Sequence, residues 1–114
     1  MNQPTLFDAE TKAVEAEKIV LYALGEFQAR KKELPGRELP LDRLRGAFRR
    51  AAEVFSADEL NDETLVNELE RLGAKIVRVP PFVAKHPFRV TVYAELALRG
   101  LEFYREQTEQ AGSL

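Results

Sequence analysis

The sequence of 114 residues predicts one α+β domain that is mainly α-helical. Three stretches in the first two thirds of the chain repeat apolar residues every three or four positions, which is the spacing of a helix with one buried face. Two short segments rich in β-branched and aromatic residues follow, and a fourth helical stretch comes after them. The composition agrees, because 45% hydrophobic and 32% charged residues are typical of a folded globular domain.

The domain boundaries are set by where helical spacing begins and fades. The first ten residues include Pro4 and show no helical period, so we interpret 1–10 as a mobile N-terminal arm. The folded domain is expected over residues 11–110. Residues 111–114 are expected to form a disordered tail.

The first two helices have recognisable ends. The first is predicted to begin at Thr11, whose hydroxyl can cap a helix N-terminus, and to end in a basic stretch before Pro35. The second is predicted to begin near Pro40, because a proline at a helix start removes an N–H that has no partner there. Its apolar positions share one arc of the helical wheel as far as Phe55, so one face should pack on the core.

The third helix is expected over residues 62–72, where Gly73 supplies a left-handed stop. Before it, Ser56 and Glu59 have the spacing of a capping box, which predicts a short helical turn at 57–60.

A hairpin and a last helix complete the predicted fold. Segments 76–79 and 88–93 have strand composition, and the connection between them contains three prolines, so it should project as a stiff loop. Helical spacing resumes at Ala94. Glycines inside the first and second predicted helices, Gly25 and Gly46, suggest that these two helices cross closely.

This order of three helices, a hairpin with a projecting loop and a C-terminal helix resembles the winged-helix variant of the helix-turn-helix over roughly residues 11–104. The main alternative is another small α+β domain in which the hairpin covers a three-helix bundle. In a winged helix the third helix normally enters the major groove. Here Glu63, Glu68 and Glu70 would repel phosphates, so DNA binding by this chain is expected to use helix two and the hairpin loop, independently of base sequence.

Charge is distributed unevenly along the chain, although its net value is only −2. Residues 30–50 carry eight basic and three acidic side chains, whereas 53–72 carry one basic and seven acidic side chains. The basic block contains arginines outside the apolar arc of helix two, and the hairpin with its loop adds further cations. The predicted nucleic-acid-binding residues are Arg43, Arg45, Arg49, Arg50, Arg78, Lys85 and Arg89.

We interpret these residues as a surface for DNA or RNA backbone, in a domain that binds nucleic acid non-specifically or acts in a DNA-associated assembly. The alternative for the arginines is a solvated helix face, partly paired with the acidic third helix. A second function from another class is a protein-interaction adaptor or a homodimer contact. Its apolar anchors would be Phe82 and Val83, which lie in the loop between prolines.

The N-terminal residues Gln3-Pro4-Thr5-Leu6-Phe7 offer a separate hypothesis. They resemble the pentapeptide by which bacterial replication and repair proteins bind the sliding clamp, with Gln3, Leu6 and Phe7 as the matching positions. The resemblance implies an extended peptide whose two apolar side chains fill a groove of the clamp. Alternatively, Leu6 and Phe7 fold back against the core of their own domain.

The residue inventory gives little support to catalysis. The chain has no Cys and one His, and His86 has no carboxylate near it in sequence to orient it as a base. The glycines are scattered singly and form no phosphate-binding loop. We therefore expect a non-enzymatic protein without a metal or cofactor. It has neither a long apolar run nor a signal-peptide pattern, so a cytoplasmic location and no membrane partner are expected.

Overall fold

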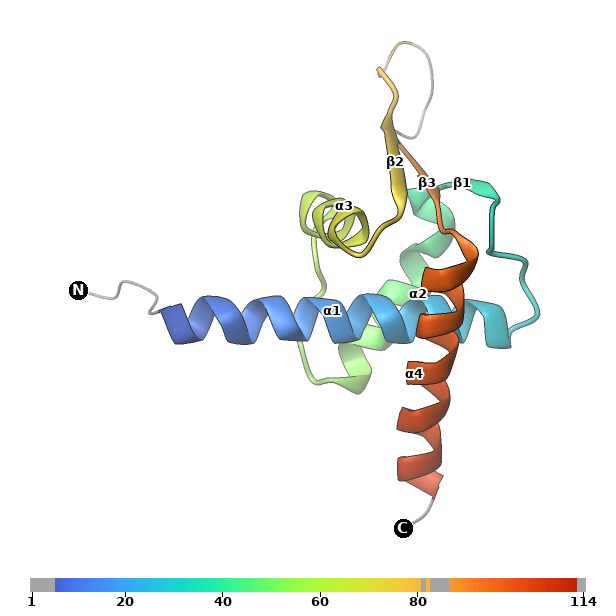
Figure 1. The fold of residues 1–114 in the computed structure, drawn as a ribbon. Helices are drawn as coiled ribbons and strands as arrows, with labels where there is room; N and C mark the ends of the chain where they lie inside the picture. The colour runs from blue at the N-terminus through green and yellow to red at the C-terminus, as the bar shows by residue number, and fades with distance from the viewer. Residues whose placement is uncertain (1–5, 81, 83–86, 113–114) are drawn as a thin grey trace.

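Four helices and a small antiparallel sheet make up the fold (Figure 1). The computed structural model describes residues 6–80, 82 and 87–112. The predicted α+β class, mainly α-helical, is confirmed. The elements in chain order are α1 (Leu6–Ala29), β1 (Glu38–Pro40), α2 (Leu41–Val54), α3 (Asp62–Arg71), β2 (Lys75–Arg78), β3 (Phe88–Thr91) and α4 (Ala94–Gly112).

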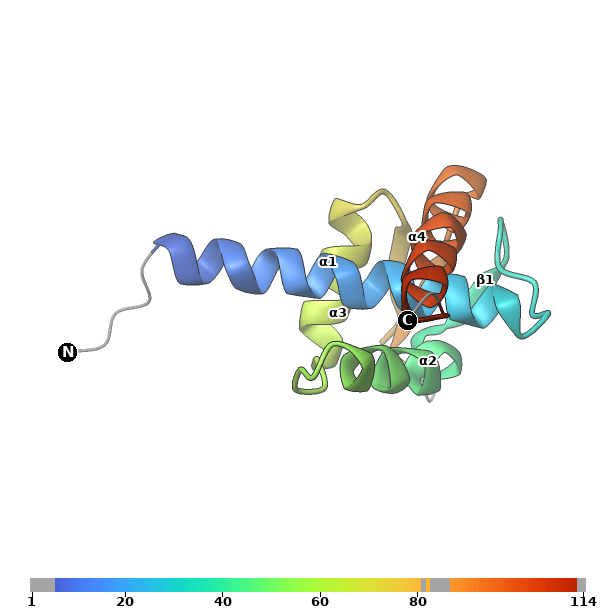
Figure 2. The same ribbon diagram turned by 90° about the horizontal axis from the view of Figure 1, so that it is seen from below.

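Helix α1 begins earlier than its sequence pattern suggested. It starts at Leu6, so the prediction of a mobile arm is wrong for residues 6–10, and Thr11 lies inside the helix and does not cap it. The extension is consistent with the local sequence, because Ala9 and Glu10 have high helix propensity and Asp is a favourable residue type in the first turn of a helix. The N-terminal half of α1 extends beyond the other elements (Figures 1 and 2).

The other end of the chain differs in the same way. Helix α4 continues to Gly112, so residues 111–112, which we expected in a disordered tail, are helical.

Helices α2 and α3 occupy the predicted segments, but the link between them differs. Ser56 has a positive φ of 52°, and its N–H donates to the carbonyl of Glu53 in the last turn of α2. An N-cap residue needs extended backbone, so Ser56 does not form the predicted capping box, and residues 57–60 are not helical. Asn61 caps α3 instead, accepting a hydrogen bond from the N–H of Thr64 at 2.9 Å.

The predicted hairpin is present, and a third strand adds to it. Strands β2 and β3 pair antiparallel, and β1 pairs with the other edge of β3, which gives the order β1-β3-β2. β1 has only three residues and ends in a proline, so it is too short for an alternating pattern to reveal it. The hairpin rises away from the helices (Figure 1).

Pairing across the sheet separates two faces. Val90 is fully buried, and its partners Leu39 and Ile76 also turn toward the helices. Residues one position along the strands therefore lie on the opposite, outer face. This outer sheet face carries the rows Pro40–Arg89–Val77 and Glu38–Thr91–Lys75.

Helix α1 lies at the centre of the core, and α4 crosses it closely (Figure 1). A Cβ on Gly25 would overlap the carbonyl oxygen of Gly100 and the Cβ of Tyr104. A Cβ on Gly100 would lie 3.0 Å from the carbonyl oxygen of Leu21. The predicted glycine-mediated crossing is thus real, but it joins α1 to α4. Gly46 was assigned to it wrongly, because near its Cβ position only the Arg50 side chain lies within 4 Å.

Candidate nucleic-acid interface

The basic face of α2 is largely used within the molecule. Of the four arginines predicted to contact nucleic acid there, three form ion pairs with carboxylates of this chain. Arg43 makes no ion pair or side-chain hydrogen bond among the described residues. The prediction that all four arginines face solvent holds only for Arg43 and Arg49, because Arg45 and Arg50 are half-buried.

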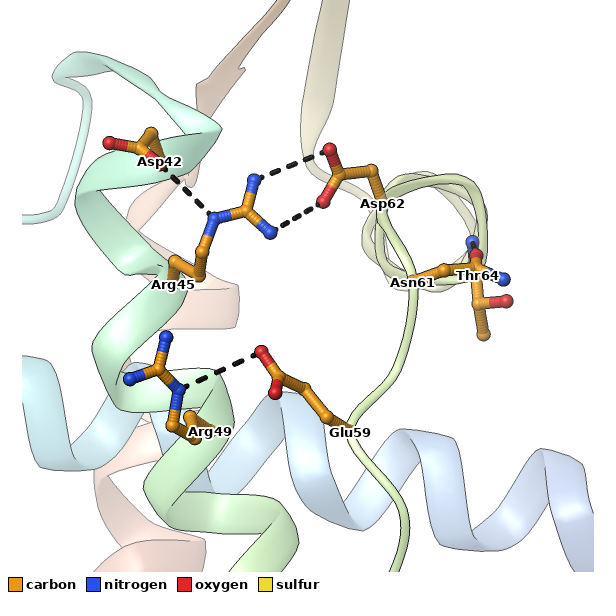
Figure 3. A network of polar contacts seen from close by, with 7 residues as sticks. All are labelled: Asp42, Arg45, Arg49, Glu59, Asn61, Asp62 and Thr64. Atoms are coloured by element: carbon orange, nitrogen blue, oxygen red, sulfur yellow. Dashed lines mark hydrogen bonds and ion pairs between the residues drawn. The ribbon is translucent and has the colours of Figure 1, made fainter.

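Arg45 joins α2 to the start of α3 (Figure 3). Its Nη1 and Nη2 donate to the two carboxylate oxygens of Asp62 at 2.9 and 3.3 Å, and its Nε donates to Asp42 at 3.1 Å. These bonds, that to Asp62 foremost, raise the pKa of the Arg45 guanidinium above its ordinary value. Arg49 points toward Glu59 in the same view, at a longer distance of 3.8 Å. The arginines on the side of α2 that faces α3 are therefore neutralised by carboxylates of their own chain.

Arg50 is paired on the other side of α2, against α1. Its Nε donates to Glu26 at 2.6 Å, and Arg30 donates to the same carboxylate oxygen at 3.2 Å. The Glu26 side chain is only 11% exposed. A carboxylate this well buried needs such partners, because an unpaired charge in that position would be strongly unfavourable. Arg50 therefore has a structural role that sequence reasoning missed.

The hairpin divides its cations between its two faces. Arg78 lies toward α3, where it approaches Glu63 at 3.5 Å and Glu70 at 3.9 Å, with its guanidinium 5.6 Å from the ring centre of Phe88. Arg89 and Lys75 lie on the outer sheet face. Neither has an ion pair within the part of the chain that the structure describes.

The exposed side of α3 is acidic, but Glu68 is not part of it. Glu63 and Glu70 are exposed, as expected. Glu68 is only 7% exposed, and both of its carboxylate oxygens accept hydrogen bonds from Arg71 at 2.7 to 3.0 Å. Glu68 therefore does not repel a phosphate at the surface. The remaining carboxylates still disfavour entry of α3 into a DNA groove.

A basic hollow lies where α1, β1 and α2 meet. Its lysines belong to the basic block of residues 30–50, and their sequence position indicated only favourable charges near a helix C-terminus. The basic block was a signal for a cationic site, but the sequence did not show that the chain folds back there to form a hollow. The hollow has a volume of about 330 Å³ and is lined by Phe27, Lys31, Lys32, Glu33, Arg37, Leu39 and Arg43.

The predicted partner-binding residues fall in different places. Phe82 is 90% exposed, as expected for an apolar anchor between the two strands. Gln3, Val83 and Lys85 lie outside the described residues, as does His86. Leu6 and Phe7 form the start of α1, which contradicts the extended conformation that the sliding-clamp peptide requires at these positions.

Other classes of site find little support in the described ranges. No group of three or more His, Cys, Asp or Glu side chains there could hold a metal ion. No helix of the described ranges combines the length with the apolar character that crossing a bilayer requires. A scan against protein-family models found no match, and searches of curated proteins and of solved structures found no significant similarity.

Proposed function

We propose that this chain is a small winged-helix-like domain without catalytic activity that binds the backbone of DNA or RNA, or acts within a DNA-associated assembly. The arrangement of elements supports the fold part of this proposal. Three helices are followed by a hairpin that rises from the body, and a fourth helix packs on the first. That order resembles a helix-turn-helix core with a wing. A cytoplasmic location fits such a protein and stays a prediction.

The observation that carries the functional part is the position of the unpaired cations. Strand β1 lies between them: Arg43 follows it in the first turn of α2, and Pro40 pairs with Arg89 across the sheet. Lys75 extends the outer sheet face on β2. Because no described carboxylate neutralises these three side chains, their charge is available to phosphates. Lys85 lies in the sequence between β2 and β3, outside the described residues, and remains a predicted contact.

Binding should be independent of base sequence. The element that would read bases, α3, exposes Glu63 and Glu70. The proposed contacts come from a sheet face and a helix start, which position a backbone but carry no base code.

The test is fluorescence anisotropy with labelled single- and double-stranded oligonucleotides that end in a 5′-hydroxyl, repeated from about 50 to 200 mM salt. We expect saturable binding that weakens steeply with salt. In Lys75→Ala/Arg89→Ala the affinity should fall, and the slope of log affinity against log salt should decrease by about 2, since each phosphate contact contributes about 0.9.

The matched control removes two cations elsewhere. Lys18 on α1 and Arg105 on α4 are exposed and, like the tested pair, make no ion pair with described residues. Lys18→Ala/Arg105→Ala should keep the wild-type salt slope. No binding at the lowest salt, or an equal loss in both double variants, would contradict the proposal.

A protein-binding role is the second candidate, and the exposure of Phe82 favours it. An aromatic side chain that is 90% exposed, two residues after Pro80, can anchor a partner by apolar contact. Such binding would respond little to salt and would be lost in Phe82→Ser while surviving Lys75→Ala/Arg89→Ala. These two variants therefore separate the two candidate functions.

A further inference from the structure

The basic hollow has apolar residues at its base and a cationic rim. Phe27 and Leu39 are 4% and 7% exposed, so the residues at its base belong to the core and hold their positions. The rim comes from three separate parts of the chain: the residues after α1, Arg37 in the loop, and Arg43 in α2. The floor therefore keeps its shape before a ligand binds.

The charge balance of the rim is strongly positive. Four cations face one carboxylate, Glu33. Within the described residues that carboxylate pairs with Arg37 alone, at 3.4 Å, and both side chains are exposed to solvent. No ion pair of Lys31, Lys32 or Arg43 is found in the described ranges. Unlike the arginines near α3, these three cations form no ion pair with any carboxylate of the described residues.

Lys31 reaches the rim in an unfavourable backbone conformation. Its φ is 62°, in the left-handed region, and its N–H donates to the carbonyl of Gln28 at 2.9 Å. Glycine adopts this conformation without steric penalty, whereas a side chain with a Cβ does not. The ends of α1 and α2 have dipoles of opposite sign and both lie beside the hollow, so the side-chain charges decide its electrostatics.

We propose that the basic hollow binds a phosphomonoester. A terminal phosphate carries up to two negative charges and three acceptor oxygens, which suit a rim of several cations better than the single charge of a diester. The limited volume fits an end group and the sugar attached to it, whose carbon atoms can lie on the apolar floor. The phosphate can be the 5′ end of a strand, in which case the inference rests on the proposed function, or a free nucleoside monophosphate.

The experiment compares two labelled single strands that differ only in a 5′-phosphate or a 5′-hydroxyl. Anisotropy at constant salt should show about tenfold tighter binding of the phosphorylated strand, since a charge-assisted contact of this kind is worth about one order of magnitude in affinity. Lys31→Gln/Lys32→Gln should abolish the difference between the strands, and Lys18→Gln/Arg105→Gln should preserve it. Saturating adenosine monophosphate should lower the affinity of the phosphorylated strand to that of the hydroxyl strand, whereas adenosine should not.

Failure of this inference can be told apart from failure of the proposed function. If both strands bind with equal affinity, the hollow does not recognise a phosphomonoester, while backbone binding stands. If neither strand binds, the proposed function is wrong. An NMR titration with adenosine monophosphate then tests whether the hollow binds a phosphomonoester. Shifts confined to the amides of residues 27–43 support it, and unchanged spectra at millimolar ligand overturn it.

Discussion

Two basic regions of this molecule are close in sequence but differ in what faces their cations. Near α3, the guanidiniums of Arg45 and Arg49 meet Asp62 and Glu59 (Figure 3). In the basic hollow, Arg43 meets no carboxylate of the described chain, although it lies only two residues before Arg45. The number of basic residues in a segment therefore does not decide whether their charge holds the fold together or remains available to a ligand.

The cause of the difference lies in the neighbouring elements. Helix α3 has Asp62 and Glu63 in its first turn, where carboxylates stabilise the positive end of the helix dipole. Arginines that face this helix start find acceptors already in place. The segment after α1 carries Lys31 and Lys32, which suit the negative end of that helix. Packing α2 between these two ends pairs some of its arginines and leaves Arg43 beside like charges.

The largest expected effect comes from removing the carboxylate beneath the paired arginines. Glu26→Ala should lower the free energy of unfolding by about 2 kcal/mol, because it removes two charge-assisted hydrogen bonds from Arg30 and Arg50 to a well-buried carboxylate and leaves space where that carboxylate was. Urea denaturation followed by circular dichroism measures the change. Affinity for the 5′-hydroxyl strand should not fall.

The control for this variant is Glu53→Ala, which removes an exposed helical glutamate that has no side-chain partner among the described residues. Its effect should lie within about 0.5 kcal/mol of zero. Equal stability of the two variants would show that Arg50 is not a structural cation, and the division between paired and unpaired arginines would not hold on this side of α2.

A smaller effect is expected at the exposed pair. Asp62→Ala removes both bonds to Arg45 and one favourable charge at the start of α3. Both side chains are about one third exposed, so solvent screening limits the loss to about 1 kcal/mol or less. Asp58→Ala, with the same loss of charge but no partner in the described structure, should cost less. Thermal unfolding of the two variants distinguishes them, and equal melting temperatures would contradict the structural role of Arg45.

Sequence patterns predicted the helices and the hairpin because each has several turns or alternating positions. They did not reveal β1, whose three residues are held by pairing with β3 and not by their own pattern. The crossing partner of Gly25 was also out of reach. A glycine inside a helix indicates a close approach, but only the arrangement of α1 and α4 identifies Gly100 as the residue approached.

For the candidate site, the sequence pattern predicted the local charge and, as an alternative, pairing of α2 arginines with the acidic third helix, which the bonds from Arg45 to Asp62 confirm. The basic block of residues 30–50 was visible, and Arg43 was correctly placed at the surface. The pairing of Arg50 with Glu26 joins residues 24 positions apart, and periodicity cannot predict a contact at that separation. The hollow was missed for the same reason, since its floor and rim come from elements that only the tertiary fold brings together.

The smallest effect, of opposite sign, is expected at Lys31. Lys31→Gly relieves the strain of a left-handed φ of 62° and should raise the free energy of unfolding by about 0.5 kcal/mol, since the larger entropy of glycine in the unfolded chain offsets part of the gain. In the same variant, the preference for the 5′-phosphorylated strand over the 5′-hydroxyl strand should decrease. The control is Ser56→Gly, because Ser56 is the second non-glycine residue with a positive φ in the described structure. This variant should stabilise the fold without changing binding. If Lys31→Gly improves folding but impairs phosphate recognition, the lysine contributes its charge to binding and not to stability. A loss of stability in Lys31→Gly would instead assign Lys31 to the structural cations.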